Sequence, residues 1–109
     1  MNKRTAVRAS LAVVLSMKLA PAASSAADIA AGELLAEKWC AECHSTRPER
    51  LSRNLAAPTF PELAAEPSIT QYSLRAFLRS PHETMPQITF TREQMDDIVD
   101  YIMSLKPHD

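Results

Sequence analysis

Apolar residues recur at helical spacing in four segments of this 109-residue chain, and strand-like alternation is almost absent. The clearest segment opens with "TREQ", a capping box in which Thr91 is the N-cap and Gln94 reaches back to it. Apolar side chains then recur every three or four residues, and acidic side chains take the opposite face. The apolar set is Met95, Ile98, Val99, Ile102 and Leu105, and the acidic set is Asp96, Asp97 and Asp100. We therefore predict a long helix that Pro107 ends.

The segment before the two cysteines is also predicted to be helical. It runs from Ile29 to Trp39 or Cys40, and Asp28 can serve as its N-cap. Its apolar side consists of Leu34, Leu35 and Trp39. We expect this side to face the core.

Two further helices are predicted between these segments. A short one covers Pro61 to Ala65, because proline suits a first turn. The other covers Gln71 to Arg79 and ends before Pro81, and its apolar face consists of Leu74, Phe77 and Leu78. Only "QITF", residues 87–90, resembles a strand. The predicted fold is therefore all-α, about four helices with a long proline-containing connection between residues 45 and 70.

The first 27 residues have the layout of a secretory signal peptide. "MNKRTAVR" is basic, "ASLAVVLSM" is a short apolar run, and small residues follow as far as Ala27. The apolar run is far shorter than the roughly 20 residues of a membrane-spanning helix. We predict a cleaved leader, residues 1–27, that exports a mature domain, residues 28–109, to the periplasm. Cleavage after Ala26 fits nearly as well, and a retained basic tail is the alternative.

Removal of that leader changes the charge of the protein. The full sequence has a formal net charge of −1, but all 13 acidic residues and only eight of the 12 basic ones lie in residues 28–109, which gives the mature domain −5. Nucleic acid is a poor match, because phosphate binding needs clustered Lys and Arg. A single glycine also argues against phosphate-cradling loops. A protein partner with a basic docking surface suits this charge.

Both cysteines of the chain lie in "KWCAECHS", residues 38–45. Three uses compete for this spacing: a redox disulfide, part of a zinc site, and covalent attachment of haem. A redox pair normally follows a strand, and His44 is poorly placed to complete a zinc tetrahedron with its neighbour Cys43. In the third use, Cys40 and Cys43 each add to a vinyl group of the porphyrin, and His44 is held beneath the iron. An exported helical chain of 82 residues, small enough to need a cofactor, favours this third use.

The chain resembles a small class I cytochrome c of the bacterial periplasmic type over nearly all of residues 28–109. "AGELLAEKWCAECH" is similar to the family's first helix and haem motif, and "APTFPELA" to its proline-containing stretch. "LRAFLRSPHETMP" resembles the middle helix and methionine loop, and "FTREQMDDIVDYIMSL" the closing helix. The resemblance lies in this ordered combination, and it implies one covalently bound haem c.

The resemblance implies roles for individual residues. Cys40 and Cys43 correspond to the thioether attachments, and His44 to the proximal ligand of the iron. Pro58 corresponds to the proline whose carbonyl accepts the proton of that imidazole and fixes its tautomer. The positions that match the family's contact between first and closing helices are Gly32, Ile98 and Tyr101.

Met85 is expected to be the sixth ligand of the iron. It lies in a loop directly before Pro86, where the family places its distal thioether, whereas methionines on the last predicted helix fill the core. His82, three residues away, is the competing ligand. This loop is shorter than in mitochondrial relatives, and Phe77 stands where those relatives have a tyrosine that bonds the ligand sulfur.

Ligation by histidine and methionine fills both axial positions, which favours electron transfer over enzymatic turnover. We therefore expect a monomeric, monohaem carrier of a respiratory chain that passes single electrons between a donor dehydrogenase and an acceptor oxidase or reductase. Two alternatives remain open. One is a haem protein with an open sixth site that senses or processes CO, NO or peroxide, and the other is a haem subunit of a larger oxidoreductase.

Overall fold

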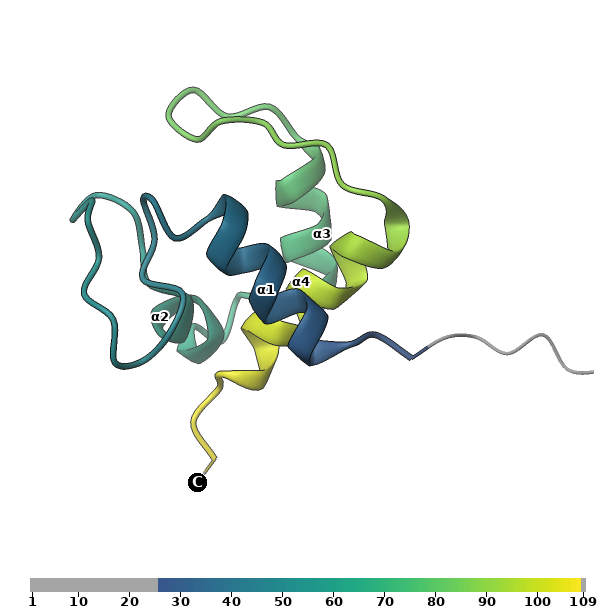
Figure 1. The fold of residues 1–109 in the computed structure, drawn as a ribbon, viewed down its shortest axis with the longest axis horizontal. Coiled ribbons are helices and arrows are strands. Elements are labelled where there is room, and N and C mark those ends of the chain that lie inside the picture. Colours follow the sequence, from purple (N-terminus) through teal and green to yellow (C-terminus); the bar gives the residue numbers. More distant parts are fainter. Residues whose placement is uncertain (1–25, 109) are drawn as a thin grey trace, which may run out of the picture.

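Four α-helices form the structure, a computed structural model that describes residues 26–108. In chain order they are α1 (Ile29–Trp39), α2 (Phe60–Ala65), α3 (Gln71–Arg79) and α4 (Arg92–Ser104) (Figure 1). No strand occurs among the described residues, and residues 87–90 belong to neither a helix nor a strand. The all-α prediction is confirmed. Residues 1–25 of the predicted leader lie outside the described residues.

Each helix begins at a side chain that caps it. Asp28 accepts the backbone N–H of Ala31, as the sequence predicted. Capping boxes open the other three helices, and their N-caps are Thr59, Thr70 and Thr91. The box at Thr59 was not predicted, and because of it α2 begins at Phe60 rather than Pro61. The helix starts therefore follow from local chemistry that is readable in the sequence.

The core is organised around the place where α1 crosses α4 (Figure 1). Gly32 is buried there, and a Cβ at this position would overlap the backbone carbonyl of Asp97 and lie 2.8 Å from the Cβ of Tyr101. Only glycine lets the two backbones approach this closely. The buried residues of α4 are Met95, Ile98, Val99, Tyr101 and Ile102, and they pack with Ala36, Cys40, Phe60 and Leu74.

The predicted apolar side of α1 is only partly correct. Leu34 is 70% exposed and Trp39 is 48% exposed, whereas Leu35 packs against the core. The side that faces α4 carries Gly32 and Ala36 instead. Leu34 lies two residues from each of these, which places it on the opposite side of a helix with 3.6 residues per turn. The close crossing at the glycine thus decided which side of α1 is buried.

The other predicted helix faces differ in detail from the sequence pattern. On α3, Leu74 is buried and Leu78 packs on the core, but Phe77 is 47% exposed. On the acidic face of α4, Asp97 accepts the backbone N–H of Asp28 at 2.7 Å. Two more aspartates join α4 to α3 through contacts of 2.8 Å, Asp96 with Arg75 and Asp100 with Gln71. The acidic face therefore also holds neighbouring helices. No helix within residues 26–108 has the length and apolarity to span a membrane.

Candidate functional site

The two cysteines and His44 lie in one turn, residues 40–44, which we call the cysteine turn. Cys40 caps the C-terminal end of α1, and its carbonyl accepts the N–H groups of Cys43 at 3.2 Å and of His44 at 2.9 Å. Both thiols are free, and Cys40 is buried. Burial raises the pKa of the Cys40 thiol to about 11. The turn thus presents two protein thiols directly followed by an imidazole.

The imidazole of His44 is oriented by a backbone carbonyl. Its Nδ1 lies 2.6 Å from the carbonyl oxygen of Pro58, 14 residues along the chain. A carbonyl only accepts, so Nδ1 carries the proton and Nε2 keeps its lone pair for a metal. Phe60 packs on the imidazole with ring centroids 5.5 Å apart, and its N–H donates to the carbonyl of Ser45 at 2.9 Å. Pro58 directly precedes Thr59, the N-cap of α2, so the start of this helix positions the Pro58 carbonyl that orients His44.

Buried polar groups hold the chain directly after His44. Tyr101 of α4 donates its hydroxyl to the carbonyl of Thr46 at 2.7 Å, and Thr46 is fully buried. The Thr46 hydroxyl donates to Glu37 of α1, which also pairs with Arg50. The Thr46 hydrogen bond is the main cause that lowers the pKa of Glu37 below its ordinary value of 4.5. This network ties the cysteine turn to both long helices.

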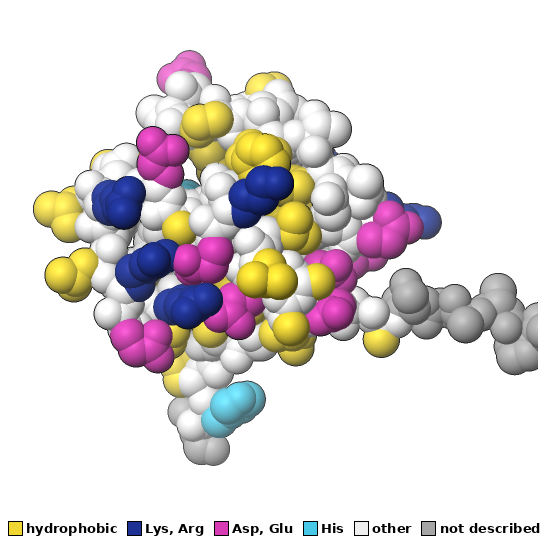
Figure 2. All heavy atoms as spheres, in the orientation of Figure 1, with side chains coloured by type: hydrophobic (Ala, Val, Ile, Leu, Met, Phe, Trp, Pro, Cys, Tyr) yellow, Lys and Arg dark blue, Asp and Glu magenta, His cyan; other side chains and the backbone are white. Residues whose placement is uncertain are grey.

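The exposed part of the same loop is fastened as well. Ser52 donates its hydroxyl to the carbonyl of Cys43 at 2.9 Å. Arg47 pairs with Glu33 of α1 at 2.8 Å. Figure 2 shows basic and acidic side chains interspersed on the face over α1 and this loop. The His44 side of the site, which we define as residues 37–60, therefore has contacts along much of its length.

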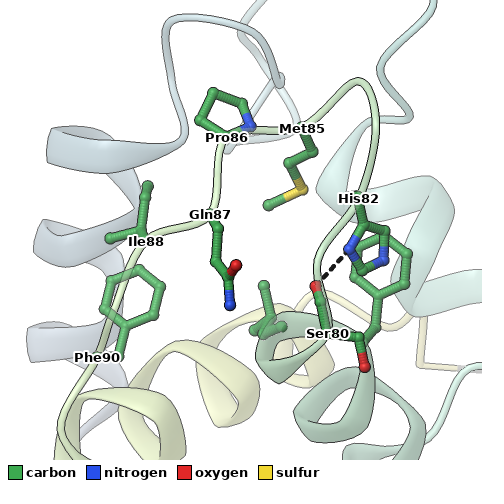
Figure 3. Close-up of a pocket in the computed structure, with 9 residues that line it drawn as sticks. Ser80, His82, Met85, Pro86, Gln87, Ile88 and Phe90 are labelled. Carbon is green, nitrogen blue, oxygen red and sulfur yellow. Dashed lines mark hydrogen bonds between the residues drawn. The ribbon is translucent and has the colours of Figure 1, made fainter.

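Met85 lies in a different setting, in the segment 81–90 between α3 and α4, which we call the methionine loop. Its thioether points into a small cavity (Figure 3), whose lining residues are Phe77, Leu78, Ser80, His82, Met85, Pro86, Gln87, Ile88 and Phe90. A larger, open cavity of about 240 Å³ shares part of this lining and reaches Met95 of α4. Six of the nine residues that line the small cavity are apolar, and Met85 contributes the one sulfur among them.

His82 lines the same cavity as Met85 but is packed against α3. Its ring centroid lies 3.5 Å from that of Phe77, and its Nδ1 lies 2.6 Å from the carbonyl oxygen of Ser80 (Figure 3). In Figure 3 the Met85 thioether points from the loop into the space beside Gln87, and the His82 ring lies at the side of that space, near Ser80.

The cysteine turn does not line either cavity. The two parts of the site meet instead through the core, where Cys40, Phe60 and Met95 belong to one packed cluster. The predicted site residues are thus distributed over two segments that share a core.

The donor set fits a haem better than the competing uses of the cysteines. Two thiols at haem-attachment spacing suit the vinyl groups of a haem, and an imidazole with Nε2 available and the thioether of Met85 suit its iron. Among residues 26–108, no group of three or more His, Cys, Asp or Glu side chains could hold a metal ion, as a zinc site would require.

Several residues that shape the site were missed by sequence reasoning. Phe60, Thr46 and Glu37 contact His44 or hold the chain after it. Tyr101 was expected as a helix-packing residue, and its bond to a residue 55 positions away was not. Only the threonine–glutamate spacing at the start of α2 offered a local signal for any of these contacts.

Comparisons with known proteins agree with this donor set. The family described as "Cytochrome C oxidase, cbb3-type, subunit III" matches residues 27–102. The chain is 33% identical over 97 residues to cytochrome c-552 from Bradyrhizobium diazoefficiens, which covers 89% of this chain and 93% of that protein. No solved structure gives a significant match. The family match includes the cysteine turn, Pro58 and the methionine loop.

Proposed function

The chain belongs to the small class I c-type cytochromes, electron-transfer proteins with covalently bound haem c, and on this premise we propose which of its residues hold the haem. Cys40 and Cys43 form the thioether bonds, His44 is the proximal ligand of the iron, and Met85 is the distal ligand. The observation that carries this proposal is the contact of 2.6 Å between His44 Nδ1 and the Pro58 carbonyl, because it leaves Nε2 as the ligating nitrogen.

The residues of the chain have separable tasks in this arrangement. The bound haem supplies one-electron chemistry. The Pro58 carbonyl makes His44 a stronger donor, and Phe60 keeps its ring in place. Met85 is half-buried in its cavity, and a methionine ligand would raise the reduction potential of the iron.

We propose that the protein is a monomeric periplasmic electron carrier. With both axial positions filled there is no open site for a substrate, so the protein passes single electrons between a dehydrogenase and a terminal acceptor of a respiratory chain. Residues 1–27 serve as the signal peptide for export, and residues 28–109 form the mature domain.

The charge of the mature domain supports a particular kind of redox partner. With a formal charge of −5, residues 28–109 suit a partner that presents a basic docking surface. We expect weak association that loosens as salt increases, because surface charges are screened. Binding that tightens with salt would contradict this docking.

A second candidate is a haem subunit of a larger oxidoreductase. The description of the matching family, which names a subunit of an oxidase, favours it. Purification of the protein from membranes with a catalytic subunit would support this candidate, and isolation as a free monomer would support the carrier.

The test of haem attachment is the intact mass of protein exported with its leader alongside the haem-attachment machinery. The expected product begins at Asp28 and carries one haem, and the variant Cys40→Ala/Cys43→Ala carries none. The matched control is Glu42→Gln, at an exposed position between the two cysteines, which keeps the haem. Covalent haem in the double cysteine variant, or none in the unaltered protein, would contradict the proposal.

A further inference from the structure

His82 and His44 share one hydrogen-bond arrangement. In each, Nδ1 lies 2.6 Å from a backbone carbonyl oxygen, that of Ser80 for His82 and that of Pro58 for His44. A carbonyl accepts only, so Nδ1 carries the proton in both rings. In the neutral form of each ring the lone pair is therefore on Nε2, which makes no hydrogen bond within the described part of the chain. His82 is therefore already in the tautomer that a metal ligand needs.

His82 is also placed beside the residue it would replace. It is half-buried, it lines the same cavity as Met85, and the two are three residues apart on one loop (Figure 3). The aromatic ring of Phe77 supports the imidazole from α3. The Phe77–His82 contact thus holds the imidazole at the wall of the cavity.

The methionine loop has few contacts that would oppose a small shift. Residues 81–90 contain no helix, and none of them makes a backbone hydrogen bond to another described residue. His82 is joined to the end of α3 by its contact with Ser80, the C-cap residue, and this is the one hydrogen bond between the loop and the other described residues. Segments with few backbone bonds rearrange at low free-energy cost. A shift that exchanges one loop side chain for its neighbour is therefore compatible with an intact helical core.

From these observations we propose that His82 is a reserve axial ligand, whose Nε2 takes the sixth position when the Met85 thioether leaves the iron. The proposal rests on the proposed ligation by His44 and Met85. Loss of the thioether then gives a closed site with two histidine ligands instead of an open one. Because the thioether raises the potential, this state has a lower potential than the starting state. In this state the sixth position would be filled, so small ligands such as CO would bind slowly.

The test compares CO binding to the reduced haem protein in variants that lack the thioether. The variants are Met85→Leu, which conserves volume, and the same change combined with His82→Ala. We expect CO association with Met85→Leu to be about tenfold slower or more than with the double variant, because only molecules with an open site bind. The spectrum of oxidised Met85→Leu should be low-spin without a sulfur band. The matched control is Met85→Leu/His108→Ala, which removes a histidine outside the site and should behave as Met85→Leu.

Equal CO rates in Met85→Leu and Met85→Leu/His82→Ala would overturn the proposal. So would an equal gain of rate in the control, because a histidine outside the loop would then be the ligand. If Met85→Leu does not accumulate, Met85→Ala with the same second changes gives the same comparison. Failure of the proposed function has a separate signature, since fast CO binding to the unaltered protein would show that Met85 is not a ligand.

Discussion

The two axial sides of the candidate site are held in contrasting ways. On the His44 side, the Pro58 carbonyl accepts from the histidine, Tyr101 and Ser52 donate to backbone carbonyls beside it, and a capping box opens α2. In the methionine loop, by contrast, the contact between His82 and Ser80 is the one hydrogen bond that links residues 81–90 to other described residues. Both sides rest on the same helical core.

The difference suggests a division of labour between the ligands. Because His44 is oriented before the cofactor binds, its ligation costs little further ordering of the chain, and this favours a permanent ligand. A methionine in a loop with few bonds depends on the iron itself for its position, which allows exchange. The predictions below disturb each side in turn and compare the effects.

The largest effect is expected where the helices that support the His44 side cross. Gly32→Val places side-chain atoms against the Asp97 carbonyl and should lower the free energy of unfolding by about 3 kcal/mol or more. Urea unfolding followed by circular dichroism measures this. Ala30→Val, on an exposed position of the same helix, is the matched control and should cost less than about 1 kcal/mol.

A smaller loss is expected when the buried bond behind His44 is removed. Tyr101→Phe leaves the carbonyl of the fully buried Thr46 without its donor and should cost about 1–3 kcal/mol in the same unfolding experiment. Tyr72→Phe removes the hydroxyl of a residue that is 83% exposed and should be neutral. Equal effects of the two changes would mean that the bond to Thr46 does not stabilise the His44 side.

The hydrogen bond between Thr46 and Glu37 should make the stability of the protein depend on pH. The pKa of Glu37 is lowered by folding, so its contribution is present above the ordinary value of 4.5 and is lost as pH falls through the folded pKa. In Glu37→Gln this contribution is absent at every pH. The melting temperatures of the variant and the unaltered protein should therefore differ at pH 7 and converge towards pH 3. Glu42→Gln, an exposed change in the cysteine turn, serves as control. A constant difference across this range would contradict the assignment.

The smallest effects compare matched hydroxyl deletions on the two sides. Ser52→Ala removes the hydrogen bond to the Cys43 carbonyl and should cost about 0.5–1.5 kcal/mol. Thr84→Ala, in the methionine loop, should stay within about 0.5 kcal/mol. Unfolding free energies of both variants give the comparison directly. A cost for Thr84→Ala as large as that for Ser52→Ala would remove the contrast between the sides.

The sequence predicted what local chemistry determines. The caps at Asp28 and Thr91, the extents of α1 and α3 and the spacing of the cysteine turn all depend on neighbouring residues. The exposure of Leu34 could not be predicted in this way, because the α1–α4 crossing decides which side is buried. The bond between Tyr101 and Thr46 joins residues 55 positions apart, which leaves no periodic pattern. The contact between His82 and Phe77 joins residues only five apart, but it depends on the path of the chain after the C-cap of α3, which a helical pattern does not describe.

The most direct test of the central claim, ligation by His44 and Met85, is the absorption spectrum of the exported haem protein, oxidised and reduced, with and without CO. We expect a c-type reduced spectrum, a weak oxidised band from sulfur-to-iron charge transfer that is lost in Met85→Leu, and little response of the unaltered protein to CO. A c-type spectrum without that band and with fast CO binding would contradict the claim and favour a ligand-handling haem protein.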